Sequence, residues 1–74
     1  MKTNITLESL VARYKKVKTR RSLVRLADLA LAEASAAILY AQHCDLADAL
    51  LSIGDAANFG AVARWCIEKA ERAT

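Results

Sequence analysis

The residues best suited to chemistry in this 74-residue chain are a dense run of cations, one histidine and two thiols. Seven Lys or Arg side chains stand within thirteen residues: Arg13, Lys15, Lys16, Lys18, Arg20, Arg21 and Arg25. Such a cluster can neutralise several phosphates, and binding of that kind weakens steeply as salt is added. Tyr14 is the only aromatic residue among them, so the stacking platforms of a single-strand binder are missing. The cluster predicts either a nucleic-acid contact or a basic face that pairs with an acidic protein surface.

The histidine and the thiols do not predict an enzyme. His43 and Cys44 are neighbours in sequence, and neighbouring side chains on a helix diverge by about 100°, so they rarely act together as base and nucleophile. A metal site would need both to converge with Cys66 and a carboxylate such as Asp45, without any ligand pair at the usual spacing. We therefore expect no catalytic residue, no metal ion and no cofactor.

Two cysteines in so short a chain do not make the disulfide framework of a small secreted domain. We expect reduced thiols that serve as small core residues, which points to the cytoplasm. The long apolar stretch begins after residue 22 and contains Arg25, Asp28 and Glu33. These charges predict neither a signal peptide nor a membrane span.

Composition favours helices, because proline is absent, glycine occurs twice, and alanine and leucine abound. The length predicts one domain over residues 1–74, which buries only roughly 60% of the surface of its unfolded chain. A core this small is often completed by a second copy, so we expect a homo-oligomer, most simply a dimer. Charge is uneven: residues 1–25 hold eight Lys or Arg against one Glu, a net +7, and residues 26–74 hold three against seven acids, a net −4. The basic end is expected to attract an anionic partner or the acidic half of another copy.

The first helix is expected over about residues 7–18, with Thr6 as its N-cap. Two interpretations compete beyond it. A seven-residue repeat would allow one long helix; it consists of Leu10, Val17, Val24, Leu31 and Ile38. The crowded charges favour a break between Lys18 and Ser22 instead, with Ser22 capping the next helix.

The second helix, over about residues 22–42, has almost no polar face and is predicted to be mostly buried. Its Ala27 and Ala34 alternate with the larger Leu31 and Ile38, and small residues of that kind let two helix backbones approach closely. Asp45 is expected to cap a short third helix that Gly54 ends. A last helix then comes after a cap at residue 55 or 58. The predicted fold is all-α, a small bundle of three or four helices around the mostly buried central helix.

Two segments resemble parts of known helical families. The sequences LADAL at 46–50 and AVARW at 61–65 resemble the two helices of a helix-turn-helix of the Cro and repressor type, but ten residues separate them, about twice the number in that family. We do not adopt that resemblance. Residues 37–50 resemble the helical hairpins of tetratricopeptide repeats, which implies a hairpin architecture only.

These patterns lead to a functional hypothesis. We expect a small non-enzymatic interaction protein that regulates or inhibits a larger protein, in the manner of phage and plasmid accessory proteins. Tyr14, Tyr40 and Trp65 are the candidate aromatic contacts at its interface. The alternative is a nucleic-acid-binding regulator that uses residues 13–25.

Overall fold

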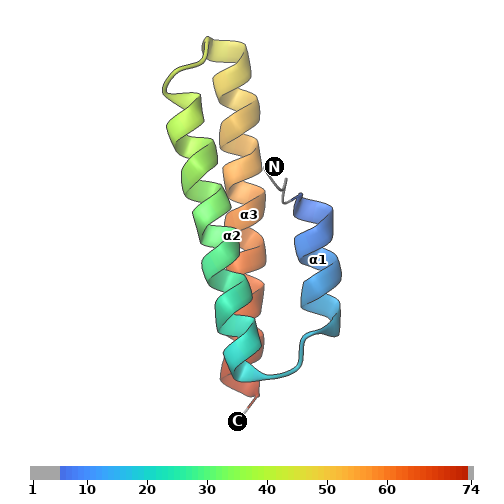
Figure 1. Cartoon of the computed structure of the whole chain (residues 1–74). Coiled ribbons are helices and arrows are strands. Elements are labelled where there is room, and N and C mark those ends of the chain that lie inside the picture. The colour runs from blue at the N-terminus through green and yellow to red at the C-terminus, as the bar shows by residue number, and fades with distance from the viewer. Residues whose placement is uncertain (1–5, 74) are drawn as a thin grey trace, which may run out of the picture.

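Three helices and short connections account for residues 6–73, which are the residues that the computed structural model describes. The helices are α1 (Leu7–Lys16), α2 (Arg20–Ala41) and α3 (Leu46–Arg72). Figure 1 shows α2 and α3 as a long antiparallel hairpin, with α1 lying along its lower half. No strand occurs within residues 6–73, so the all-α prediction is confirmed.

The start of α1 is set by its cap. The Oγ1 atom of Thr6 accepts a hydrogen bond from the backbone N–H of Ser9 at 3.1 Å, as predicted for an N-cap. The helix ends at Lys16, two residues before its predicted end, because Val17 takes an extended conformation.

The predicted break between the first two helices is present, which excludes one continuous helix. Ser22 is not its cap, and that prediction is wrong. The N-cap is Thr19, whose extended backbone leaves its Oγ1 free to accept the backbone N–H of Ser22 at 3.2 Å. As a result α2 begins at Arg20, two residues earlier than predicted.

The predicted end of the third helix at Gly54 is also wrong. Asp45 caps the helix as expected, with its Oδ1 accepting the N–H of Asp48 at 3.0 Å. The helix then continues through Gly54 and Gly60 to Arg72, and neither glycine has a positive φ. One helix therefore replaces the two that were predicted, and the two segments of the helix-turn-helix resemblance lie on it in a line.

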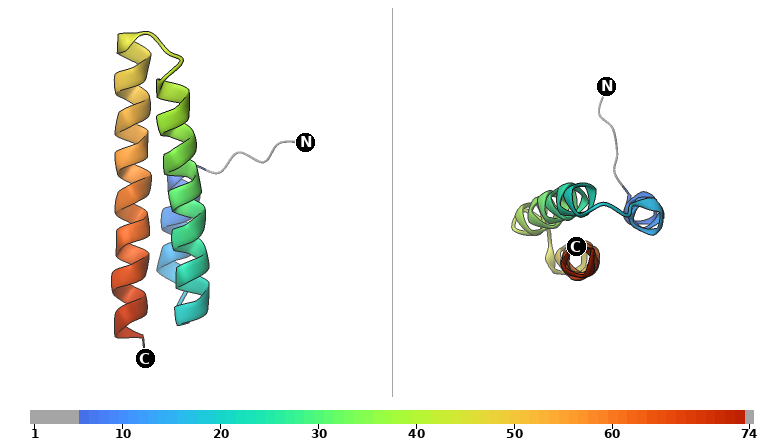
Figure 2. Two further views of the ribbon diagram at one scale, coloured as in Figure 1. Left: turned by 90° about the vertical axis from the view of Figure 1, so that its left-hand side faces the viewer. Right: turned by 90° about the horizontal axis from the view of Figure 1, so that it is seen from below.

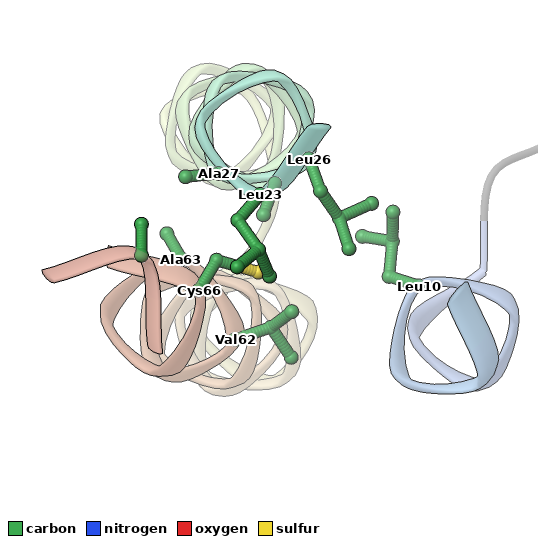
Figure 3. Packing of buried hydrophobic residues seen from close by; sticks show 9 residues of the cluster. Leu10, Leu23, Leu26, Ala27, Val62, Ala63 and Cys66 are labelled. Carbon is green, nitrogen blue, oxygen red and sulfur yellow. The ribbon is translucent and has the colours of Figure 1, made fainter. Parts of the chain in front are cut away.

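The core lies where all three helices meet, in the lower half of the hairpin. Its buried side chains are Leu10, Leu23, Leu26, Ala27, Ala30, Val62, Ala63, Cys66 and Ala70. Figure 3 shows Leu10 of α1 directed at Leu26 of α2, and Leu23 of α2 between the hairpin helices. Seen from below, α1 stands to one side of the hairpin (Figure 2, right).

A mostly buried central helix is not confirmed within one chain. The alanine row of α2 is buried, including Ala27 and Ala34, but Leu31 and Ile38 are about half exposed. The small residues therefore make the close contact between α2 and α3, and the larger residues of the seven-residue repeat lie outside it. Within residues 6–73, α1 and α3 cover α2 on two sides only.

Candidate interaction surfaces

Large apolar side chains are unusually exposed on this small protein. They are Val24, Leu31, Ile38, Leu39, Tyr40, Leu46, Leu50, Leu51, Ile53, Trp65 and Ile67. Eight of these eleven fall in residues 31–60, here called the upper half; the lower half is the remainder of residues 6–73. Contiguous exposed apolar surface marks interaction sites on soluble proteins.

One set of these side chains forms a face along the hairpin, here called the outer face: Val24, Leu31 and Ile38 of α2 with Ile53 and Ile67 of α3. Steps of seven residues return to almost the same side of a helix, so each row faces one way. Leu31, Gly60, Ala63 and Ile67 line one shallow groove of about 350 Å³, which brings the two rows together. The five side chains are 38–54% exposed, which forgoes about 1 kcal/mol of burial for each.

The outer face points away from α1. In Figure 3, Leu26 and Val62 lie on the side of the hairpin contact that faces α1, and Ala27 and Ala63 lie on the other side. Leu31 comes one turn after Ala27 on α2, so it continues that second side. No α1 residue lines the groove at Leu31. In the described part of the chain the outer face is therefore uncovered, because α1 packs on the opposite side of the hairpin.

A second apolar surface, here called the tip, is formed where the hairpin turns. Its residues are Leu39, Tyr40, Leu46, Leu50 and Leu51, which are 60–86% exposed. The Sγ atom of Cys44 donates a hydrogen bond to the carbonyl oxygen of Tyr40 at 3.2 Å. Hydrogen bonding with Cys44 and the charges of Cys44 and Asp48 raise the pKa of the Tyr40 phenol. The phenol is therefore neutral at physiological pH and can donate a hydrogen bond to a partner.

A groove of about 490 Å³ adjoins the tip on the side of α1, above the first turn of that helix. Its apolar lining includes Tyr40, Phe59 and Leu7 of α1, and Glu33 and Asp55 are its two acids. This upper groove lies where α1 would pass if it extended further along the hairpin.

The basic segment is the set of seven cations predicted from the sequence, and all seven are exposed on the last turns of α1, the connection to α2 and the first turns of α2. Three of them, Arg13, Lys16 and Arg25, line a groove of about 350 Å³ that also includes Leu26 and Leu29. Within residues 6–73 the only ion pair joins Arg64 and Glu68, so no acid of that range pairs with the basic segment.

The structure separates the three candidate aromatic residues. Tyr14 holds α1 to α3: its ring lies 6.1 Å from that of Trp65, and the Nζ of Lys69 lies 4.8 Å from its centroid. Lys69 also donates a hydrogen bond to the Tyr14 carbonyl oxygen at 3.2 Å. Trp65 remains partly exposed beside this contact, and Tyr40 lies apart from both, at the tip. No sequence signal indicates the part that Lys69 plays, since it depends on how α1 docks.

The structure groups no catalytic or metal-binding set among the described residues. No three His, Cys, Asp or Glu side chains of residues 6–73 lie where they could hold one metal ion. Cys66 is fully buried, and desolvation raises the pKa of its thiol although the charge of Lys69 opposes the shift. Such a thiol is unreactive near neutral pH. Cys44 is only partly covered, so burial does not protect it in the same way.

By length and composition alone, α3 could cross a membrane. It has 27 residues and contains an 18-residue stretch of mean hydropathy 1.2, of which 22% is buried. The core helix of a soluble protein passes the same test.

The outer face was not predicted from the sequence, because the third helix was expected to end at Gly54. The signal becomes visible once α3 is continuous: Ile53, Gly60 and Ile67 recur at steps of seven, as Val24, Leu31 and Ile38 do on α2.

Comparison of the chain with protein-family models, curated proteins and solved structures finds no match.

Proposed function

We propose that this chain is a small non-enzymatic interaction protein that associates with itself and regulates or inhibits a larger protein through its helical surface. The observation that supports this most is the exposed tip. Leu46, Leu50 and Leu51 are more than two-thirds exposed and contribute nothing to the core. At a helix end that stays in contact with water, polar side chains are favoured over apolar ones. A protein partner is therefore the simplest reason for large apolar side chains at the tip.

Charge indicates the chemistry of that partner. The chain has no Lys or Arg between Arg25 and Arg64, and its upper half carries four acids. Glu33 and Asp55 lie in the upper groove beside Tyr40. A partner surface with apolar side chains and a basic rim would complement both the tip and this groove.

The predicted bundle with a wrapped central helix belongs to this assembly rather than to the single chain. Chains that pack on the exposed sides of α2 would cover Leu31 and Ile38 and complete the bundle. We place the protein in the cytoplasm, in keeping with two unpaired thiols. Membrane insertion is disfavoured because Asp55 would cost about 2.5 to 3.5 kcal/mol near the centre of a span that begins at Leu46. A phage or plasmid accessory role is part of the proposal, on grounds of size alone.

Affinity capture from the native host tests this function, with the tip varied. We expect the wild-type chain to enrich one larger protein and Leu50→Asp to lose at least nine-tenths of it. Ala32→Asp is the matched control, because it adds the same charge at an exposed position of α2 outside the tip. Equal capture by the wild type and Leu50→Asp would contradict a partner site at the tip.

The basic segment supports a second candidate function, nucleic-acid binding. Arg13, Lys16 and Arg25 converge on one groove and pair with no acid of residues 6–73, which suits phosphate contacts. A titration with duplex DNA and with RNA at 50 and 200 mM salt separates the two functions. Binding that weakens at least tenfold over that range would support this candidate, and absent or salt-insensitive binding would remove it.

A further inference from the structure

We propose that the outer face binds a second copy of this chain, antiparallel to the first, about a two-fold axis that crosses the hairpin at the height of Leu31 and Gly60. This inference rests on the self-association in the proposed function and specifies its surface and orientation. The product is a four-helix core in which α2 packs on the partner's α2 and α3 on the partner's α3.

The spacing of the apolar residues supplies the symmetry. On α2, Val24 and Ile38 each lie seven residues from Leu31, and on α3, Ile53 and Ile67 each lie seven residues from Gly60. Leu31 and Gly60 line the same groove, so the centres of the two rows lie close together along the hairpin. A two-fold axis through that height places Val24 opposite Ile38 of the partner subunit, and Ile53 opposite Ile67 of the partner subunit. The interface is then built from one patch on both copies, as a two-fold interface requires.

Gly60 leaves room at the centre of the face. Apart from Gly60 itself, its chain neighbours and the nearby backbone of α3, no heavy atom lies within 4 Å of the position that a Cβ atom would take there. The φ of Gly60 is not positive, so the backbone does not require glycine. The two Leu31 side chains meet at the axis, and the space beside each Gly60 can receive them. Helix pairs with small residues at the crossing approach more closely and bury more of their flanks.

Charge selects the antiparallel orientation. The upper half carries four acids and no Lys or Arg, a net −4; the lower half carries ten Lys or Arg against four acids, a net +6. An antiparallel pair places the acidic half of each copy beside the basic half of the other. A parallel pair would place like charges together at both ends, which is unfavourable at moderate salt. At the rim of the groove Arg64 and Glu68 pair at 3.6 Å, so these two charges do not oppose contact there.

A second copy fits this face better than the larger partner does. The face is equally apolar at its two ends, and Leu51 of the tip stands two residues before Ile53, so its side chain points to another side of α3. Both tips of the dimer, one at each end, would stay free for other proteins.

Sedimentation equilibrium of the full chain from 1 to 100 µM tests the surface. We expect the wild type to have a mass near twice 8.0 kDa at the upper concentrations. Leu31→Asp should weaken dimerisation at least tenfold, and Leu51→Asp, at an equally apolar exposed position of the tip, should leave it unchanged. A monomeric wild type, or equal losses in both variants, would overturn the proposal. Partner capture through the tip is measured separately, so it can succeed although the dimer fails.

Two glycine variants of α3 control for a loss of dimerisation that is caused only by misfolding. Gly60→Gln and Gly54→Gln both place a helix-compatible side chain in open space on α3, but only Gly60 lies on the outer face. We expect both to keep the helical circular dichroism of the wild type, and Gly60→Gln alone to weaken dimerisation at least tenfold. Equal affinities for the two variants would contradict close contact at Gly60.

Disulfide cross-linking in a Cys44→Ala background tests the orientation. Antiparallel packing predicts that Leu31→Cys links to itself, and that Val24→Cys links to Ile38→Cys in a mixture but not to itself. A parallel dimer would instead link Leu31→Cys to Gly60→Cys, and that result would overturn the proposed orientation.

Discussion

Both halves of the hairpin carry large apolar side chains, but the two halves bury them to different extents. In the lower half α1 adds a third helix, and large side chains such as Leu10, Leu23 and Val62 are fully buried. In the upper half α2 and α3 meet through small residues, of which Ala34, Ser52 and Ala56 are buried, and the large side chains lie outside.

The difference shows how little apolar surface a contact between two helices can bury. Two helices share a single line of contact, which small residues fill best, and the flanks of that line need another layer. α1 supplies this layer for only part of the length, since its 10 residues span about 15 Å and the 27 residues of α3 span about 40 Å. The upper half and the outer face are therefore apolar surfaces without a neighbour in the described part of the chain.

The largest expected effect on the free energy of unfolding comes from Leu10, the residue that packs α1 against the hairpin. Leu10→Ala removes the only fully buried side chain of α1, and we expect it to lower the free energy of unfolding by about 2 to 5 kcal/mol. Urea unfolding followed by circular dichroism, at one protein concentration, measures the loss. Leu50→Ala in the exposed tip should change the same quantity by less than about 0.5 kcal/mol. Similar losses in both variants would remove the contrast between the halves.

The two-helix contact is tested by enlarging one of its small residues. Ala34→Leu should lower the free energy of unfolding by about 1 to 3 kcal/mol, because Ala34 is buried between α2 and α3. Ala32→Leu is the control, since it makes the same substitution at an exposed position of the same helix. An unchanged melting temperature for Ala34→Leu would show that the helices are not in close contact there.

A smaller effect of opposite sign is expected at Gly54. Gly54→Ala should raise the free energy of unfolding by about 0.5 to 1 kcal/mol, because the helical backbone is retained and the unfolded chain has less freedom. Ala57→Gly, at an exposed position of the same helix, should lower it by a similar amount. A loss of stability in Gly54→Ala would contradict a continuous α3.

The smallest expected effect is on the pH dependence of stability, and it comes from the Cys66 thiol in the lower half. Burial raises the pKa of the Cys66 thiol in the folded chain, so the neutral thiol favours folding below the ordinary thiol pKa. That contribution is lost as the pH rises through the raised pKa of the folded state. We expect the melting temperature to fall between pH 8 and 10.5 by more in the wild type than in Cys66→Ala. Parallel curves would contradict a buried thiol, as would labelling of Cys66 at pH 7 at the rate of Cys44.

Local signals in the sequence predict the helices better than their ends. Thr6 and Asp45 are recognisable as caps because a cap needs only a short polar side chain ahead of an apolar run. The prediction at Gly54 is wrong because a glycine ends a helix only where the residues after it abandon the helical conformation. Here Ala56 and Ala63, which follow Gly54, pack on α2 and keep the chain helical. The break after α1 is predictable from the crowded charges, whereas the choice between Thr19 and Ser22 as its cap is not.

The surfaces are predictable only in part. The basic segment is found from the sequence because a run of like charge is exposed wherever it folds. The apolar character of α2 is also evident, but Leu31 and Ile38 are predicted to be interior, since a sequence does not show how far a third helix reaches. Tyr14 remains a predicted interface residue, and its contact with α3 of its own chain has no signal in the sequence. That contact depends on how α1 and α3 pack, which no local pattern encodes.

The short connection between α2 and α3 has a consequence for folding order. Only residues 42–45 separate the two helices, so the contacts nearest the turn close small loops at little entropic cost. We expect the hairpin to form from this turn towards the chain ends, on the microsecond to millisecond scale of proteins with local contacts, and α1 to dock last. On a ribosome, the apolar tip would thus emerge and take shape before the basic end gains its final partner, Lys69 of α3.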